Sequence, residues 1–269
     1  MRIFKPGWGI AALLGLAIVP ASADNHHIAL NNILMGGYYD GKWLSTVALH
    51  GPTWLWGGED AHVFYPDGRM VDGVACAINR DHPEEERVEK LHRNDRPDAP
   101  VFSIQLSDYR SVSYPSHTLV LTTEIEWDVM PRKAEKLPVD NARYKALAAD
   151  FLAGRGLPYN RVKLTGLQKV DLDGNGADEV IMVGHAVDGK VPFAMLRQLQ
   201  QGHIATTMLS EPSDGKVTDL FTADLNGDSR MEVVVGSQSE KYIHQAVYTI
   251  NQGNTDRVIH NSWLLYQKP

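Results

Sequence analysis

The second half of the chain is built from short apolar segments separated by polar turns, and it follows one plan twice. In each copy an apolar segment leads into an acidic loop, a second segment leaves the loop, and two more follow. Segments of this length that are rich in β-branched and aromatic residues predict β-strands. The predicted strands are residues 162–170, 180–185, 191–198, 205–209, 217–223, 231–235, 246–251 and 258–266.

The first half also has the pattern of strands joined by tight turns. Tyr39-Asp40-Gly41 and Tyr65-Pro66-Asp67-Gly68 combine residues that favour turns, so each predicts a hairpin between its flanking segments. The segments with a strand-like pattern are residues 42–49, 62–65, 69–78, 101–106 and 119–127.

Two segments have the pattern of short helices. Residues 83–93 follow Asp81, which suits an N-cap, and they carry proline and acidic residues early and basic residues late. Residues 140–152 are amphipathic, and Gly154 and Gly156 end the pattern. The predicted fold class is therefore mainly β with two short helices.

A change in composition near residues 131–138, where Lys and Pro gather, indicates a domain boundary. We expect a β-rich N-terminal domain at residues 24–130, a connector and helix at 131–156, and two β repeats at 157–269. A spacing of about 50 residues with four strands per repeat is typical of propeller blades. Two blades cannot close a ring, so the alternatives are an isolated pair of sheets or a packing in which N-terminal strands complete the core.

The first 23 residues have the three parts of a secretory signal peptide. Arg2 and Lys5 form a basic region, residues 10–19 are apolar, and Ala21-Ser22-Ala23 offers small residues for cleavage. We therefore expect a periplasmic or secreted protein. The alternative is an uncleaved anchor, but the apolar run is about half of the ~20 residues that span a bilayer. No integral membrane segment is expected after cleavage, and no cysteine follows for a lipid anchor.

Charge and cysteine content narrow the class of partners. Removal of the leader takes the formal charge from −7 to −9, because it carries two of the 26 basic residues and no acidic one. Without a basic stripe, nucleic acid and anionic membranes are excluded as expected partners. The single cysteine, Cys76, lies in an apolar alternation that predicts a buried strand rather than a catalytic thiol.

Cleavage after Ala23 would expose the sequence Asp24-Asn25-His26-His27. A histidine third from a free amine can bind Cu(II) or Ni(II) through the amine, two backbone amides and the imidazole. The alternative is a solvated terminus without metal, and a cut after Ala21 would abolish the motif.

The acidic loop at residues 171–179 places oxygen-bearing side chains at alternate positions. If Asp171 is position 1, such side chains fall at positions 1, 3, 5 and 9, and glycines at positions 4 and 6 allow a backbone that wraps around a cation. The carbonyl of position 7 would complete the set. The predicted ligands are Asp171, Asp173, Asn175, Ala177 and Glu179.

The same layout returns 53 residues later. Here position 4 is Gly227, whereas position 6 is Ser229 in place of glycine. The predicted ligands are Asp224, Asn226, Asp228, Arg230 through its carbonyl, and Glu232. Both loops are again followed by an apolar run that predicts a strand.

The ligand types favour Ca²⁺ as the bound cofactor. Calcium takes six to eight oxygens, whereas Mg²⁺ demands a tighter octahedron and Zn²⁺ prefers nitrogen or sulfur. An EF-hand is the obvious competitor, but position 12, where a bidentate glutamate should stand, is Met182 in the first loop and Val235 in the second. The alternative for both loops is a polar Asx-turn without metal.

Residues 171–184 and 224–236 resemble the calcium loops, D-x-[DN]-G-[DN]-G-x-x-[DE], of FG-GAP/VCBS-type repeats in integrin α-subunits and many exported bacterial proteins. The resemblance covers residues 157–269 and implies that the side chains at positions 1, 3, 5 and 9 are calcium ligands. The second loop departs from the pattern at Ser229. Positive φ there would cost about 1 kcal/mol, so we expect weaker binding or none in this loop.

These features predict a calcium-stabilised binding or interaction module with an unknown protein or glycan partner. The sequence contains none of the common motifs for a nucleophile elbow, a zinc protease or a phosphate loop. The alternative is a secreted hydrolase acting on glycans, with its site around Trp54, Trp56 and Asp60. The two tryptophans, with Trp43, could form a sugar-stacking platform or simply belong to the core.

Overall fold

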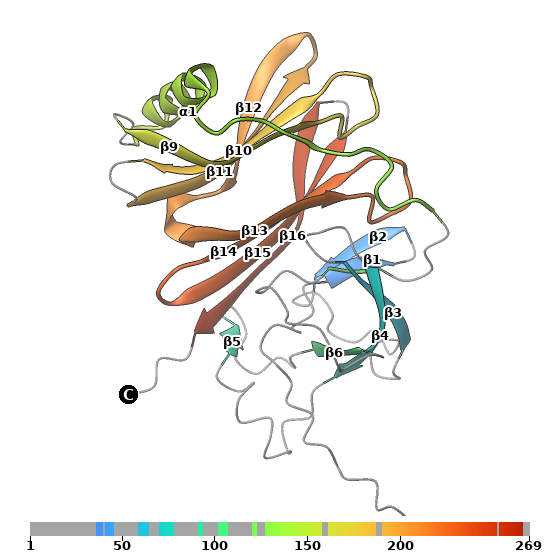
Figure 1. Ribbon diagram of the computed structural model, residues 1–269. Coiled ribbons are helices and arrows are strands. Elements are labelled where there is room, and N and C mark those ends of the chain that lie inside the picture. The colour runs from blue at the N-terminus through green and yellow to red at the C-terminus, as the bar shows by residue number, and fades with distance from the viewer. Residues whose placement is uncertain are drawn as a thin grey trace, which may run out of the picture.

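The structure is a computed structural model in which most of the second half and short segments of the first half are described. The described residues are 36–39, 41–45, 59–64, 70–77, 91–93, 102–106, 120–122, 127–157, 161–186, 190–251 and 253–265. This part of the chain is mainly β, as predicted, and its strands form three sheets (Figure 1). Among the described strands, every pair is antiparallel except that of β1 with β7.

The first sheet belongs to the N-terminal half and has the order β2-β1-β7-β3-β4-β6. The hairpins predicted at Tyr39-Asp40-Gly41 and Tyr65-Pro66-Asp67-Gly68 are confirmed by the pairing of β1 with β2 and of β3 with β4. Cys76 lies in β4, as predicted for a strand. The six strands are β1 (Gly36–Tyr39), β2 (Lys42–Ser45), β3 (Glu59–Phe64), β4 (Met70–Ala77), β6 (Phe102–Leu106) and β7 (Val120–Thr122).

The other two sheets contain the repeats, and each is a meander of four sequential strands extended by one short strand. The second sheet has the order β12-β11-β10-β9-β8, and the third has the order β13-β14-β15-β16-β5. The strands of the second sheet are β8 (Glu135–Lys136), β9 (Val162–Val170), β10 (Glu179–Ala186), β11 (Val191–Gln200) and β12 (His203–Ser210). Those of the third are β5 (Leu91–Arg93), β13 (Lys216–Ala223), β14 (Glu232–Gln238), β15 (Tyr242–Asn251) and β16 (Asn254–Leu265).

All eight strands predicted for the repeats are confirmed, and so is the helix at residues 140–152, which is α1 (Ala142–Gly154). Asn141 caps α1, because its side chain accepts hydrogen bonds from the backbone N–H groups of Arg143 and Tyr144. A short 3₁₀-helix, η4 (Pro212–Asp214), joins the two repeats.

The helix predicted at residues 83–93 is wrong at its end, since Leu91–Arg93 form strand β5 instead. Their backbone pairs with Trp263, Leu264 and Leu265 of β16, and this long-range pairing overrides the local helical pattern. The rest of that segment lies outside the described residues. The mainly β class with two short helices is therefore corrected to one α-helix in the part of the chain that the structure describes.

The two repeat sheets pack face to face, and each outer face is covered by other segments. The core between the sheets includes Leu172, Ile181 and Leu196 from the first repeat and Val233 and Tyr248 from the second. Helix α1 covers the other face of the first repeat through Ala148 and Leu152 (Figure 1). The outer face of the second repeat is covered in part by Trp43, Val129 and Met130. N-terminal residues therefore contribute both a strand and core contacts to the repeats.

The described residues contain no helix that is long and apolar enough to cross a membrane.

Candidate metal centre

The two acidic loops occupy equivalent places in the two repeat sheets. The first connects β9 to β10, and the second connects β13 to β14. Both loops turn through left-handed backbone conformations at positions 4 and 6: Gly174 has φ +74°, Gly176 +86°, Gly227 +75° and Ser229 +64°. The positive φ expected for Ser229 is thus confirmed, and the loop keeps its shape although position 6 is not glycine.

Side-chain oxygens of the first loop bind its own backbone. The Asp171 carboxylate accepts hydrogen bonds from the N–H groups of Asn175 and Gly176, both at 3.0 Å. The Asn175 side chain accepts from Ala177 N–H at 2.7 Å, and the Asp173 carboxylate accepts from Asn175 N–H at 3.2 Å. Glu179 accepts from Leu172 N–H at 2.7 Å, so its carboxylate joins the end of the loop to its start.

The second loop repeats four of these hydrogen bonds at the same positions. The Glu232 carboxylate, at position 9, accepts from the N–H of Leu225 at position 2 (2.8 Å). The Asp224 carboxylate, at position 1, accepts from the N–H of Ser229 at position 6 (2.9 Å). The Asn226 side-chain oxygen, at position 3, accepts from the N–H of Asp228 at position 5 (3.0 Å). The Asp228 carboxylate in turn accepts from the N–H of Arg230 at position 7 (2.8 Å). The loops therefore share a local fold as well as a sequence pattern.

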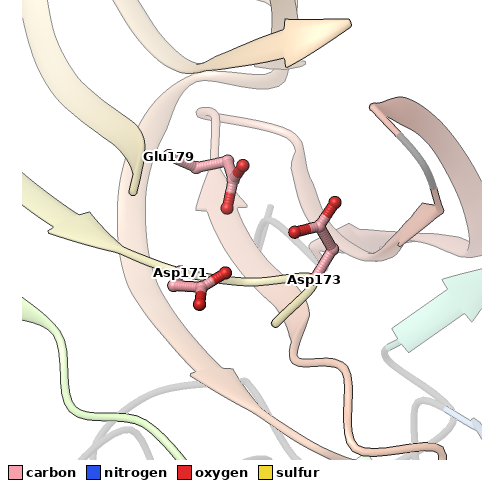
Figure 2. A group of neighbouring side chains, drawn as sticks. All are labelled: Asp171, Asp173 and Glu179. Carbon is pink, nitrogen blue, oxygen red and sulfur yellow. The ribbon is translucent and has the colours of Figure 1, made fainter. Parts of the chain in front are cut away.

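Three carboxylates of the first loop converge on one region. One oxygen from each of Asp171, Asp173 and Glu179 lies within 4.8 Å of the others, and Figure 2 shows the three groups directed toward a common space. Like charges at this separation repel, and a hard divalent cation among them would supply the missing positive charge. The geometry thus suits an oxygen-ligated metal ion, although hydrogen bonds also hold the loop without one.

Burial makes the position 9 glutamates costly to ionise. Glu179 is 2% exposed. Its desolvation, with the nearby Asp173 and Asp171 carboxylates, raises its pKa to about 7, although the hydrogen bond from Leu172 works in the other direction. Desolvation likewise raises the pKa of Glu232 well above its ordinary value, and it raises the pKa of Asp224. A bound cation would favour the ionised form of all three groups.

The loops differ in the charge that they gather at positions 1, 3 and 9. The first loop places three carboxylates there, whereas the second has the neutral amide Asn226 between Asp224 and Glu232. Among the described residues, the three carboxylates of the first loop are the one group of three or more Asp, Glu, His or Cys side chains whose potential ligand atoms lie close enough to share an ion. This difference favours tighter cation binding in the first loop, in addition to the departure at Ser229.

The other predicted ligands lie at the surface of the loops. Asn175 and Asp228 are exposed, and each uses a side-chain oxygen to accept a hydrogen bond from the backbone two residues ahead. Ala177 and Arg230 are half-buried, and the Arg230 guanidinium donates to the Asn251 side chain at 2.9 Å. Each side chain keeps acceptor capacity for a cation, because an amide oxygen has two lone pairs and a carboxylate has a second oxygen.

The backbone strain at position 6 leads to a direct prediction. Replacing Ser229 with glycine is expected to stabilise the calcium-free protein by about 0.5–1 kcal/mol, because glycine adopts positive φ without steric cost. The matched change in the first loop, Gly176→Ser, is expected to destabilise it by a similar amount. A Cβ at Gly176 would meet no atom within 4 Å, so this variant tests the backbone alone. Urea unfolding measures both, and a loss of stability in Ser229→Gly would contradict the prediction.

The sequence pattern missed two residues that hold the loops from outside. Arg132 donates to the carbonyl oxygens of Asp171 and Leu172 in the first loop, and Trp127 donates to the carbonyl oxygen of Asp224 in the second. Both belong to a segment that the sequence marked only as a connector or strand end. Nothing in a nine-residue loop motif indicates partners about 40 and 97 residues away.

The remaining predicted sites are only partly within the described residues. Trp43 is half-buried, packs on the core of the second repeat and lies edge-on to Tyr38, with ring centroids 5.2 Å apart. Trp54, Trp56, the signal peptide at residues 1–23 and the Asp24-Asn25-His26 motif lie outside the described residues. Asp60 is on β3, but only its backbone is described.

Comparison of the chain with protein-family models, with curated proteins and with solved structures finds no significant match.

Proposed function

We propose that this chain is an exported calcium-binding repeat protein in which the metal is structural and the first loop is the principal site. The observation that carries the proposal is the convergence of the Asp171, Asp173 and Glu179 carboxylates, one of them on a buried glutamate. Placing two half-buried carboxylates beside a buried one is unfavourable unless a cation or protons neutralise them. Calcium suits this donor set, because every predicted ligand atom is an oxygen.

A resemblance to FG-GAP/VCBS repeats supports the same proposal. Each repeat is a four-stranded antiparallel meander, and each carries its acidic loop between its first and second strands. The sheets also pack face to face, as neighbouring propeller blades do. We propose that the repeats are blade-like and that N-terminal strand β5 extends the second of them.

In this proposal the metal stabilises the folded form of the loops, and the biological activity is binding to a protein or glycan partner. The acidic loops are tied to the core at both ends, since Glu179 and Glu232 are buried and bind the backbone of position 2. A cation in such a place stabilises the adjoining strands rather than serving a reaction. The negative net charge agrees with a partner other than nucleic acid.

Isothermal titration of the calcium-free protein tests the metal directly. We expect calcium to bind at one stronger and one weaker site, and Mg²⁺ to compete poorly because it requires a tighter octahedron. Asp173→Asn should remove the stronger site, whereas the exposed Asp150 of α1 offers a matched control, Asp150→Asn, that should change neither. The absence of heat and of competition with a calcium dye at millimolar calcium would overturn the proposal.

The partner class is tested separately on the leader-free protein. A glycan array combined with a hydrolase screen distinguishes a binding module from the alternative of a secreted hydrolase. Saturable binding to one glycan class without turnover is the expected result. Turnover of a bound glycan would instead assign the activity to an enzyme and overturn the binding-module proposal.

A further inference from the structure

The segment at residues 127–137 lies across both acidic loops. Its Val129 carbonyl accepts a hydrogen bond from Asp224 N–H at 2.9 Å, at the start of the second loop. Further along, Glu135 and Lys136 form β8 beside β9, the strand that enters the first loop, and Leu137 N–H donates to Leu167 at 2.9 Å. We refer to residues 127–137 as the strap. The strap is held at one end by the second repeat and at the other by the first.

Arg132, in the middle of the strap, contacts both loops with one side chain. Its guanidinium donates to the Asp171 carbonyl and, at 3.0 Å, to the Leu172 carbonyl of the first loop. The same group donates to the Ser229 carbonyl of the second loop at 2.6 Å. The planar guanidinium suits these three carbonyl oxygens because its donors form a fixed fork, whereas the three donors of a lysine ammonium lie on one atom.

Trp127 makes the contact in the second loop that Arg132 makes in the first. Its indole N–H donates to the carbonyl of Asp224, at position 1, over 2.9 Å. Its ring lies against position 4, since a Cβ at Gly227 would be 2.9 Å from the ring. In the first loop Arg132 likewise binds the carbonyl of position 1 and lies over position 4, where a Cβ at Gly174 would be 3.2 Å from the guanidinium.

The loops also touch each other directly. The N–H of Met231, at position 8 of the second loop, donates to the Leu172 carbonyl, at position 2 of the first, at 2.7 Å. Leu172 and Met231 are both fully buried in the core between the sheets. The Leu172 carbonyl therefore accepts from Arg132 and from the other loop, while its N–H donates to Glu179. The Leu172 peptide is therefore a direct link between the two loops.

From this arrangement we infer that Arg132 is a positioning residue that joins the two loops into one unit, with Trp127 fixing the second loop on the same strap, so that an intact second loop raises the calcium affinity of the first. This inference rests on the proposed function. The coupling arises because calcium can tighten the first loop fully only if the Leu172 peptide is already held by Arg132 and Met231. Energetic coupling between neighbouring sites of this kind typically changes affinity by about fivefold or more.

A double-mutant cycle in calcium affinity tests the coupling. Asp224→Asn disables the second loop, and it is expected to weaken calcium binding at the first loop about fivefold in the wild-type background. In the Arg132→Lys background, which keeps the charge but loses the fork, the same substitution should change the affinity less than about twofold. Arg155→Lys is the matched control, because Arg155 forms an exposed ion pair with Glu211, a residue outside both loops.

Hydrogen exchange in calcium-free buffer provides a readout that does not depend on the metal. Arg132→Lys is expected to speed exchange of amides in both loops, including Met231. Trp127→Phe, which keeps an aromatic ring but removes the indole N–H donor, should speed amide exchange mainly in the second loop. If wild-type protein binds no calcium, the proposed function fails and this readout alone decides whether the strap joins the loops. Calcium binding with equal effects of Asp224→Asn in both backgrounds would overturn the coupling while leaving the proposed function intact.

Discussion

Calcium is expected to raise the melting temperature of the metal-free protein by several degrees, and Asp171→Asn is expected to remove most of that rise. A ligand that binds only the folded state at one hundred times its Kd contributes about 2.7 kcal/mol. For a chain of this size, each kcal/mol corresponds to roughly 2–4 °C. The expected rise is therefore roughly 5–10 °C, measured by circular dichroism with calcium and with EGTA.

Asp171 is the informative position because it serves the loop in two ways. Its carboxylate accepts hydrogen bonds from Asn175 and Gly176, and it is one of the three converging carboxylates. An asparagine keeps one of the two acceptor oxygens and nearly the same volume, and Asp171 is only half-buried, so the EGTA form should lose little stability. The charge that calcium needs is lost, and the calcium-dependent increment should fall.

The equivalent variant in the second loop, Asp224→Asn, separates the two sites. Because Asn226 and Ser229 are expected to weaken the second loop as a cation site, most of the calcium-dependent rise should remain. Its EGTA form should nevertheless melt earlier, because Asp224 is 1% exposed and its two carboxylate oxygens bind Gly227 and Ser229. An unchanged melting temperature across millimolar calcium in wild-type protein would refute the structural-metal proposal.

The repeat strands could be predicted from the sequence because their signals are local. Alternating apolar and polar residues, many of them β-branched, indicate each strand. The acidic loops indicate the turn between the first two strands of each repeat. The prediction of β9, for example, gave the observed bounds, Val162–Val170. Residues near the ends of β14 and β15 were missed because their polar side chains, such as Ser237 and Gln245, are buried in the sheet. Strand ends depend on pairing partners, which local pattern does not specify.

Strand β5 illustrates what local pattern cannot predict. Residues 83–93 carry a helix-like arrangement of charges, yet Leu91–Arg93 pair with the last strand of the chain, about 170 residues away. Local pattern likewise cannot predict the face-to-face packing of the repeat sheets, because that packing depends on which apolar faces meet. The sequence indicated which faces are apolar but not their partners.

The candidate site was predictable to the extent that it is local. The nine-residue spacing identified the three converging carboxylates and the positive φ of Ser229. It could not identify Glu179 as a group with a raised pKa, because burial follows from the core around Leu172 and Met231. Nor could it identify the strap, whose contacts go mainly to backbone carbonyl oxygens. Such contacts impose little sequence pattern on the loops themselves.

Calcium affinity is expected to depend on pH through Glu179. The folded-state pKa of this group is about 7, above its ordinary value of 4.5, because of desolvation. The protonated Glu179 side chain therefore contributes to the stability of the metal-free protein. This contribution is fully present below about pH 4.5 and is lost as pH rises through about 7. In the proposed site calcium would bind the ionised carboxylate, so binding would displace a proton at lower pH. Affinity should therefore fall about tenfold for each pH unit below 7 and should level off above it.

Calorimetric titrations in buffers of different ionisation enthalpy, at about pH 5.5, 6.5 and 8, measure both the affinity and the number of protons released. Glu179→Gln should abolish most of the proton release at the stronger site, since glutamine cannot titrate, and it should weaken binding at pH 8, where the wild-type carboxylate is ionised. Asp150→Asn is the matched control, because Asp150 is an exposed carboxylate on α1 outside both loops. An affinity that stays constant across this pH range would mean that Glu179 is ionised without calcium, and it would remove the electrostatic reason for a metal at this site.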